Sequence, residues 1–243
     1  MINVSRREEA PTSLETEEIQ QYIEDISDYL SNPQGGPKPS PPANYRNSDL
    51  LEAFSVDFHA KCYLTELKFK NASIMDVEHF ISKTERPDLR YSWENLFPAD
   101  HYSNMLKPRM TPEGGYLDPS NPNDDVESQI IYTLSIYGFD PGFEARDKNC
   151  VKTTNTCNLL NRIHNGHDER TIKGTDNLRH SIHKKYVTIL NKIIEWQQAE
   201  EGSQEKGQKG RELRDLLSRR SSFTMLVRSM PAVRLSIPGE FLD

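Results

Sequence analysis

The chain has 243 residues, of which 35% are hydrophobic and 28% are charged, and its formal net charge is −7. This length allows one substantial hydrophobic core or two small ones. No apolar run reaches the roughly 20 residues that a membrane-spanning helix needs, and the N-terminus lacks the apolar stretch of a secretory signal, so we expect neither.

The acidic charge is concentrated at the start of the chain. Residues 1 to 60 contain 11 acidic and 4 basic residues, so this segment alone accounts for the net charge of −7. The region after residue 171 is slightly basic. A small positive excess of this kind also arises from ion pairs along helices. Charge alone therefore does not support nucleic acid as a partner, although it leaves that partner open.

The acidic head predicts an amphipathic helix on a flexible tether. Thr12 and Glu15 have the spacing of a capping box. Apolar residues then recur at helical spacing: Ile19, Tyr22, Ile23, Ile26, Tyr29 and Leu30. The Pro-rich segment that follows, to residue 47, is typical of an extended linker. We expect the segment to be disordered or tethered, with this face binding another protein; the alternative is that the face docks on the chain's own core.

Residues 48 to 199 predict a core of the α+β class, a small sheet with packed helices. Alternation from Phe54 to Leu64 predicts one strand that does not turn at His59 to Lys61. A helix is expected over 71–83, with Ile74, Val77, Phe80 and Ile81 on one face. A strand is expected over 126–140, with Ile130, Tyr132, Leu134 and Ile136 on one face.

The strongest helical pattern is a long amphipathic helix over 176–199. Its stripe comprises Leu178, Ile182, Tyr186, Ile189, Leu190, Ile193 and Trp196, which form a core face or a homo-oligomer contact. Residues 200–243 predict a polar linker, a short helix and an extended C-terminal arm, which could supply one or two strands.

The stretch from residue 54 to 71 resembles the PD-(D/E)xK nuclease superfamily in one short motif. The resemblance places Asp57 as the first acid, Glu66 as the second and Lys68 as the lysine. It implies a divalent metal held by the two acids and a lysine that polarises the water or the phosphate. A single long strand would instead put Asp57 and Glu66 on opposite faces.

A second group of residues has the ligand types of a zinc site. Cys150, Cys157, His164 and His167 lie within 18 residues, and thiolate and imidazole are the ligands that zinc prefers. The six-residue spacer between the two cysteines does not fit a zinc knuckle, and the alternative is that the histidines are solvated.

The first hypothesis from these patterns is that the chain is a non-enzymatic protein that binds or assembles with other proteins. The sequence has no nucleophile elbow, phosphate-binding loop or dinucleotide fingerprint. Three cysteines without disulfide spacing predict a reducing compartment, cytoplasmic or nuclear. A metal-dependent nuclease and a zinc-stabilised nucleic-acid-binding module are the alternatives.

Overall fold

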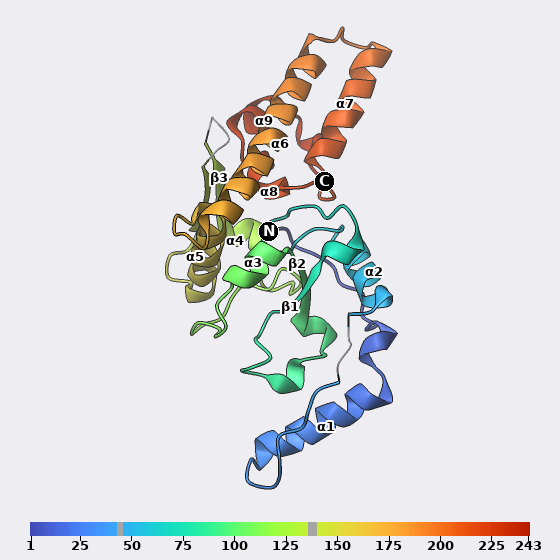
Figure 1. Ribbon diagram of the computed structural model, residues 1–243. Helices are drawn as coiled ribbons and strands as arrows, with labels where there is room; N and C mark the ends of the chain where they lie inside the picture. Colours follow the sequence, from blue (N-terminus) through green and yellow to red (C-terminus); the bar gives the residue numbers. More distant parts are fainter. Residues whose placement is uncertain (43–45, 136–139) are drawn as a thin grey trace. The chain divides into compact units, whose positions relative to one another are not determined.

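The computed structural model describes residues 1–42, 46–135 and 140–243 (Figure 1). It confirms a mixture of helices with small antiparallel sheets. The chain divides into two compact units. Unit 1 comprises Met1–Val4, Tyr63–Lys68 and Glu113–Asp243, and unit 2 comprises Ser5–Cys62 and Phe69–Pro112. The segments expected from the sequence, 1–47, 48–199 and 200–243, are continuous, whereas each unit is assembled from separate stretches.

Unit 2 contains α1 (Glu17–Ser31), α2 (Ser48–Asp57), the strands β1 (Asp76–His79) and β2 (Leu96–Ala99), and α3 (His101–Leu106). Short 3-10 turns lie at Thr12–Leu14, Ala72–Ile74, Pro87–Leu89 and Trp93–Asn95. The core of this unit is aromatic. The guanidinium carbon of Arg6 lies 4.2 Å from the ring centre of Phe97 and 4.5 Å from that of Trp93, so a cation sits among the rings.

The N-terminal helix is ordered, so the expectation of a disordered segment is wrong. α1 begins after Thr16, whose side chain accepts a hydrogen bond from the Ile19 amide, and Thr12 is not its cap. Ile19, Tyr22 and Ile26 are buried, and Tyr22 packs edge-on against Tyr91 at 5.5 Å. The predicted apolar face therefore covers part of unit 2, as in the alternative interpretation, and Leu30 at its end is 45% exposed.

The predicted strand from Phe54 to Leu64 is wrong. Residues 48–57 form α2, in which Leu50, Phe54 and then Phe58 at its C-terminus are buried at the four-residue spacing of a helix face. The chain then turns at His59 and Ala60, whose φ angles are +56° and +53°. The two rings fit both spacings, but a strand would bury Val56 with them, and Val56 is 60% exposed, as the helix requires.

The predicted helix over 71–83 is also wrong, because β1 lies there. β1 pairs with β2 in antiparallel register, with Glu78 opposite Phe97 and His79 opposite Leu96. α3 follows β2 directly, and the side chain of Asp100 caps it by accepting from the Ser103 amide. The hairpin and α3 form the framework of the site described below.

Unit 1 contains α4 (Val126–Gln129), β3 (Ile130–Leu134), β4 (Pro141–Ala145), α5 (Val151–Asn165), α6 (Ile172–Gln198), α7 (Gln204–Leu217), α8 (Thr224–Arg228) and α9 (Pro231–Ser236). A 3-10 turn at Gly239–Phe241 follows. The strand predicted over 126–140 is confirmed only for β3, where Ile130, Tyr132 and Leu134 are buried. Its first four residues form α4, and Ile136 lies outside the described residues. β3 and β4 pair antiparallel, and α5 packs on β4.

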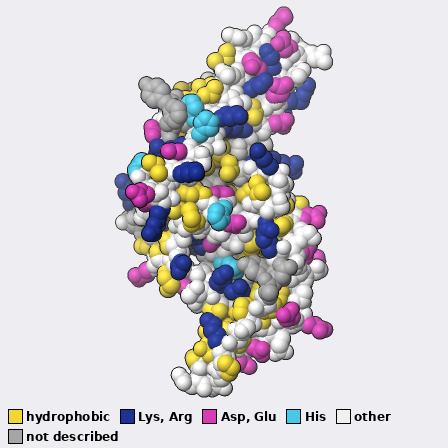
Figure 2. All heavy atoms as spheres, viewed as in Figure 1, with side chains coloured by type: hydrophobic (Ala, Val, Ile, Leu, Met, Phe, Trp, Pro, Cys, Tyr) yellow, Lys and Arg dark blue, Asp and Glu magenta, His cyan; other side chains and the backbone are white. Residues whose placement is uncertain are grey.

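The long C-terminal helix is confirmed as α6, which buries Leu178, Ile182, Tyr186, Ile189 and Ile193. The expected polar linker is largely helical, because α7 starts after a Ser203 cap. Figure 2 shows acidic and basic side chains interspersed over α6 and α7.

The expected extended arm is wrong, since α8 and α9 occupy it. Among the described residues, no helix is long and apolar enough to cross a membrane.

Candidate functional site

The hairpin and α3 of unit 2 form a cavity of about 200 Å³. Its lining comes from β1, from the loop after β1, and from α3 and the residues that follow it. These residues are Val77, Glu78, His79, Ser82, Lys83, Asn104, Lys107, Pro108 and Arg109. The cavity thus combines an imidazole, a carboxylate, an amide and three cationic side chains, which is the chemistry of an anion-binding or hydrolytic site.

His79 is the titratable group that differs most from its ordinary behaviour. Its side chain is buried, and its Nε2 lies 3.0 Å from the carbonyl oxygen of Arg90. Burial lowers the pKa of His79 to about 4, and the cations of Lys83, Arg90 and Lys107 act in the same direction. In the neutral imidazole the bond to Arg90 places the proton on Nε2, so Nδ1 carries the lone pair.

Asn95 holds the loop that separates the two strands. Its side-chain oxygen accepts from the Ile81 amide at 2.7 Å, and its side-chain nitrogen donates to the carbonyls of Ile81 and Leu89. Asn95 is buried, so these bonds are shielded from water. Because Lys83 and Arg90 lie on this loop, Asn95 acts as a positioning residue for the cavity.

Glu78 and Lys107 form a buried ion pair in the cavity wall. The Lys107 Nζ lies 2.8 Å from the Glu78 carboxylate, and it also donates to the carbonyls of His79 and Phe80, both at 2.7 Å. All three ammonium donors are therefore engaged by β1 and the residue after it. Lys107 ties the end of α3 to β1 and fixes the Glu78 carboxylate in the cavity wall.

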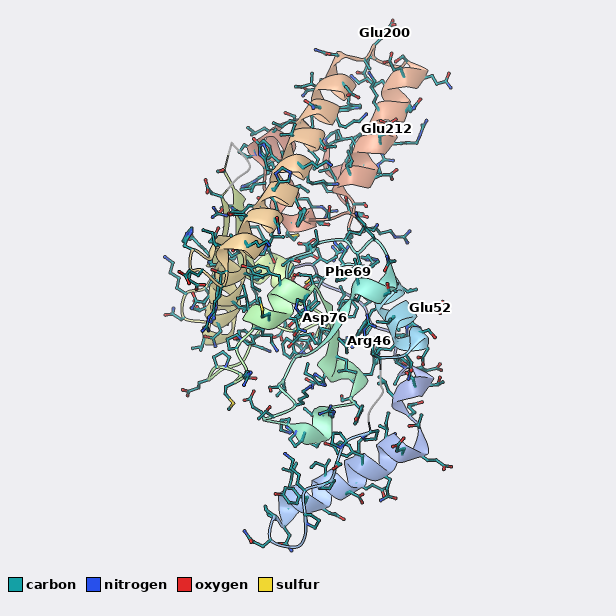
Figure 3. The ribbon with its side chains drawn as sticks, in the orientation of Figure 1. Arg46, Glu52, Phe69, Asp76, Glu200 and Glu212 are labelled. Carbon is teal, nitrogen blue, oxygen red and sulfur yellow. The ribbon has the colours of Figure 1, made fainter. Side chains whose placement is uncertain are left out.

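Asp76 binds two side chains of α3. The Asn104 side-chain nitrogen donates to the Asp76 carboxylate at 3.0 Å, and His101 Nδ1 lies 3.0 Å from the same oxygen. Arg46 donates a hydrogen bond to the carbonyl of Met75, which directly precedes Asp76. Arg46 and Asp76 are labelled in Figure 3. These contacts fix the orientation of Asn104 at the cavity.

Lys83 and Arg109 are the exposed cations of the cavity. Desolvation lowers the pKa of Lys83, and the neighbouring Arg90 lowers it further. Two exposed cations beside a buried neutral imidazole provide an entrance for an anionic group.

The three residues of the predicted nuclease motif are each engaged elsewhere. Asp57 forms a two-pronged contact with Arg7 in unit 2. In unit 1, Glu66 is buried and has a φ angle of +57°. Its carboxylate forms an ion pair with the Met1 amine at 3.0 Å and accepts a hydrogen bond from the Thr224 amide at the start of α8. Lys68 donates to the carbonyl of Arg220. Asp57 and Glu66 thus belong to different units, and each has its own structural partner.

The predicted zinc ligands lie just before, in and just after α5. Cys150 precedes the helix, and its sulfur accepts from the Thr153 hydroxyl. Cys157 is buried, which raises the pKa of its thiol to about 11. His164 is buried against Phe143, and His167 is exposed. Across the described residues, no three His, Cys, Asp or Glu side chains gather to hold a metal ion.

The sequence reasoning missed the cavity because it assigned 71–83 to a helix. The available signal was weak: Asp76, Val77 and Glu78 alternate, and an acid directly precedes a histidine. A four-residue strand is too short for its periodicity to outweigh a helical pattern of the same apolar residues.

The chain matches no protein-family model, and no curated protein shows significant similarity to it.

Proposed function

We propose that unit 2 hydrolyses phosphodiesters at the cavity around His79. The observation that carries this proposal is the burial of a neutral histidine in a cavity that two exposed cations and a carboxylate also line. A buried base that stays unprotonated and cations that attract a phosphate are the two parts that phosphodiester hydrolysis requires. This keeps the nuclease class considered from the sequence, with different residues.

In this proposal Lys83 and Arg109 bind the non-bridging oxygens of the phosphate. The His79 imidazole removes a proton from water, the water oxygen forms a bond to phosphorus, and the ester oxygen leaves and is protonated by solvent. The negative charge of the bound phosphate raises the pKa of His79 toward the range in which a general base is most effective. Asn95 and Lys107 act as positioning residues.

A divalent cation bound in the same cavity would take oxygen ligands. The Glu78 carboxylate and the Asn104 amide oxygen would be its protein ligands, and Mg²⁺ commonly takes one or two such ligands together with water and substrate phosphate. The metal would stabilise the charge that develops on the phosphate.

Hydrolysis of bis(p-nitrophenyl) phosphate and of labelled oligonucleotides by the full chain tests the proposal. With Mg²⁺ or Mn²⁺ we expect cleavage that falls at least 100-fold in His79→Ala, the usual contribution of a general base. Lys83→Ala and Arg109→Ala should raise KM more than they lower kcat. The same assays in EDTA measure the requirement for metal.

The matched control is His180→Ala, an exposed histidine on α6 in unit 1, which should cleave like the parent chain. Equal activity in His79→Ala and the parent, with both folded, would show that the activity does not come from this cavity. Absence of hydrolysis with every substrate and metal would remove the proposal.

Partner binding through the end of α1 is a second candidate. Leu30 is exposed, and Asp25, Asp28, Tyr29 and residues of the Pro-rich segment line a hollow of about 670 Å³ at the same end of α1. This acidic surface suits a basic, partly apolar partner segment. A photo-crosslinker at position 30 should give one discrete adduct with the partner segment. A crosslinker at Glu24, on another side of the helix, is the control and should give none. Equal labelling from both positions would contradict the candidate.

A further inference from the structure

A second cavity, of about 730 Å³, lies in unit 1 between α7, the end of α6 and the C-terminal 3-10 turn. All of its residues belong to unit 1, and none of them is used by the hydrolytic site proposed above. Its volume is within the range of ligand-binding clefts. Glu200, labelled in Figure 3, marks the turn between α6 and α7 near this cavity, and Glu212 marks α7.

An aromatic pair forms one side of the cavity. The rings of Trp196 and Phe241 lie 5.4 Å apart and are tilted by 60°. Trp196 is half-buried and Phe241 is buried, so Trp196 is the ring that faces an incoming ligand. Gly210 of α7 permits this packing, since a Cβ there would lie 3.3 Å from the indole nitrogen.

Three cations border the aromatic pair. Arg211 and Arg214 are exposed, and the Arg214 guanidinium lies 4.9 Å from the ring centre of Phe241. Lys206 lies 5.1 Å from the ring centre of Trp196 and pairs with Glu201, whose side chain is 87% exposed. The Lys206 side chain itself is 17% exposed, whereas its partner Glu201 extends into solvent, so a phosphate can take the place of the Glu201 carboxylate on Lys206.

Gly207 keeps the wall of the cavity open. It lies inside α7, where glycine is less favourable than alanine. A Cβ at this position would meet only the end of the Arg211 side chain, at 3.7 Å. Packing therefore does not require glycine there, and the missing side chain instead widens the cavity beside Arg211.

We propose that this cavity binds single-stranded nucleic acid. A base stacks on Trp196 while Lys206, Arg211 and Arg214 contact the backbone phosphates, which is the combination that single-strand binding sites use. Glu201 and Glu240 also line the cavity, so the three cations exceed the carboxylates by one charge and binding depends on stacking as well as on charge. An acidic peptide would use the cations without the ring.

Fluorescence anisotropy with labelled dT12 and U12 tests the proposal on the 243-residue chain carrying His79→Ala, which prevents cleavage of the probe by the proposed hydrolytic site. Relative to that background, Trp196→Leu should weaken binding about tenfold, the effect of losing one stacked base. Arg211→Glu should weaken binding and flatten its dependence on salt. Gly207→Ala should weaken binding while raising the Tm. The DNA and RNA probes distinguish the two sources of the ligand.

Lys209→Ala is the matched control, because Lys209 lies on α7, pairs with Glu205 and is outside the cavity lining. Should Trp196→Leu fail to fold, quenching of Trp196 by the unlabelled oligonucleotides replaces it, measured in a Trp93→Phe protein that leaves one tryptophan. Absence of binding, equal binding by all variants, or equal competition by polyglutamate would overturn the proposal. Binding without hydrolysis would leave it standing and remove only the activity proposed for His79.

Discussion

The surroundings of His79 determine the pH at which its imidazole gains a proton. Its imidazole is buried next to the Arg90 carbonyl, and desolvation together with nearby cations lowers its pKa from 6.5 to about 4. The folded protein therefore keeps this histidine neutral over a pH range in which the unfolded chain protonates it. This difference links the stability of unit 2 to pH.

Acid should therefore destabilise the protein through His79. The folded pKa lies below the unfolded one, so the contribution is complete above pH 6.5 and is lost as the pH falls from 6.5 toward 4. At pH 4.5 the loss is about 2 to 3 kcal/mol, since one pKa unit corresponds to roughly 1.4 kcal/mol. Urea unfolding at pH 7 and pH 4.5 measures it.

The non-titrating variant His79→Gln serves as the reference for that measurement. Other carboxyl groups titrate in the same range in both proteins, so only the difference between the two reports on His79. We expect the parent to lose more unfolding free energy than His79→Gln between the two pH values. An equal loss in both would show that the histidine is not held neutral by the fold.

The type of a residue suggested the chemistry that it could perform, but the sequence did not show where that residue lies in the structure. Glu66 was a reasonable candidate for a metal ligand because it precedes Lys68 at strand spacing. In the structure its carboxylate receives the amides at the start of α8, more than 150 residues along the chain. A partner at such a separation leaves no local pattern, so sequence reasoning had no means to assign Glu66 this role.

At the scale of elements, long helices were predictable and short elements were not. α6 repeats its apolar spacing over seven turns, which no other structure fits. β1 has four residues, and its assignment depends on pairing with β2, about 20 residues away. The helix α2 was misassigned because Phe54 and Phe58 satisfy both the alternating and the helical spacing.

The candidate site follows from this difference between elements. Glu78 and His79 belong to a short strand, and Asn104 and Lys107 belong to a short helix and its end. Their convergence depends on the β1–β2 register and on the bonds of Lys107. The groups in the cavity were visible in the sequence, whereas their proximity was not.

At the scale of the whole molecule, both units include residues from the first 47 positions. Unit 2 uses Arg6 and the buried face of α1, while unit 1 uses Asn3, whose side chain donates to Asp125. Deleting residues 1–47 should therefore unfold unit 2, because three buried α1 side chains contribute roughly 5 kcal/mol or more, comparable with total stability. Circular dichroism and urea unfolding check this expectation.

Replacement of residues 33–40 by a Gly/Ser stretch of equal length is the control, because this segment is almost entirely exposed. It should leave the unfolding free energy nearly unchanged. A cooperatively folded protein after deletion of 1–47 would instead support the tethered-helix hypothesis drawn from the sequence.

The division of the chain also affects what a broken backbone would do. The chain passes between the units after residues 4, 62, 68 and 112. A protease cut at 112 would give two fragments, yet the first would still contribute residues 1–4 and 63–68 to unit 1. Two hydrogen bonds anchor these pieces. The Arg219 guanidinium donates to the carbonyl of Asn3, and the Thr224 amide donates to the carboxylate of Glu66. The severed protein would thus remain one particle, joined by hydrogen bonds in place of a peptide bond.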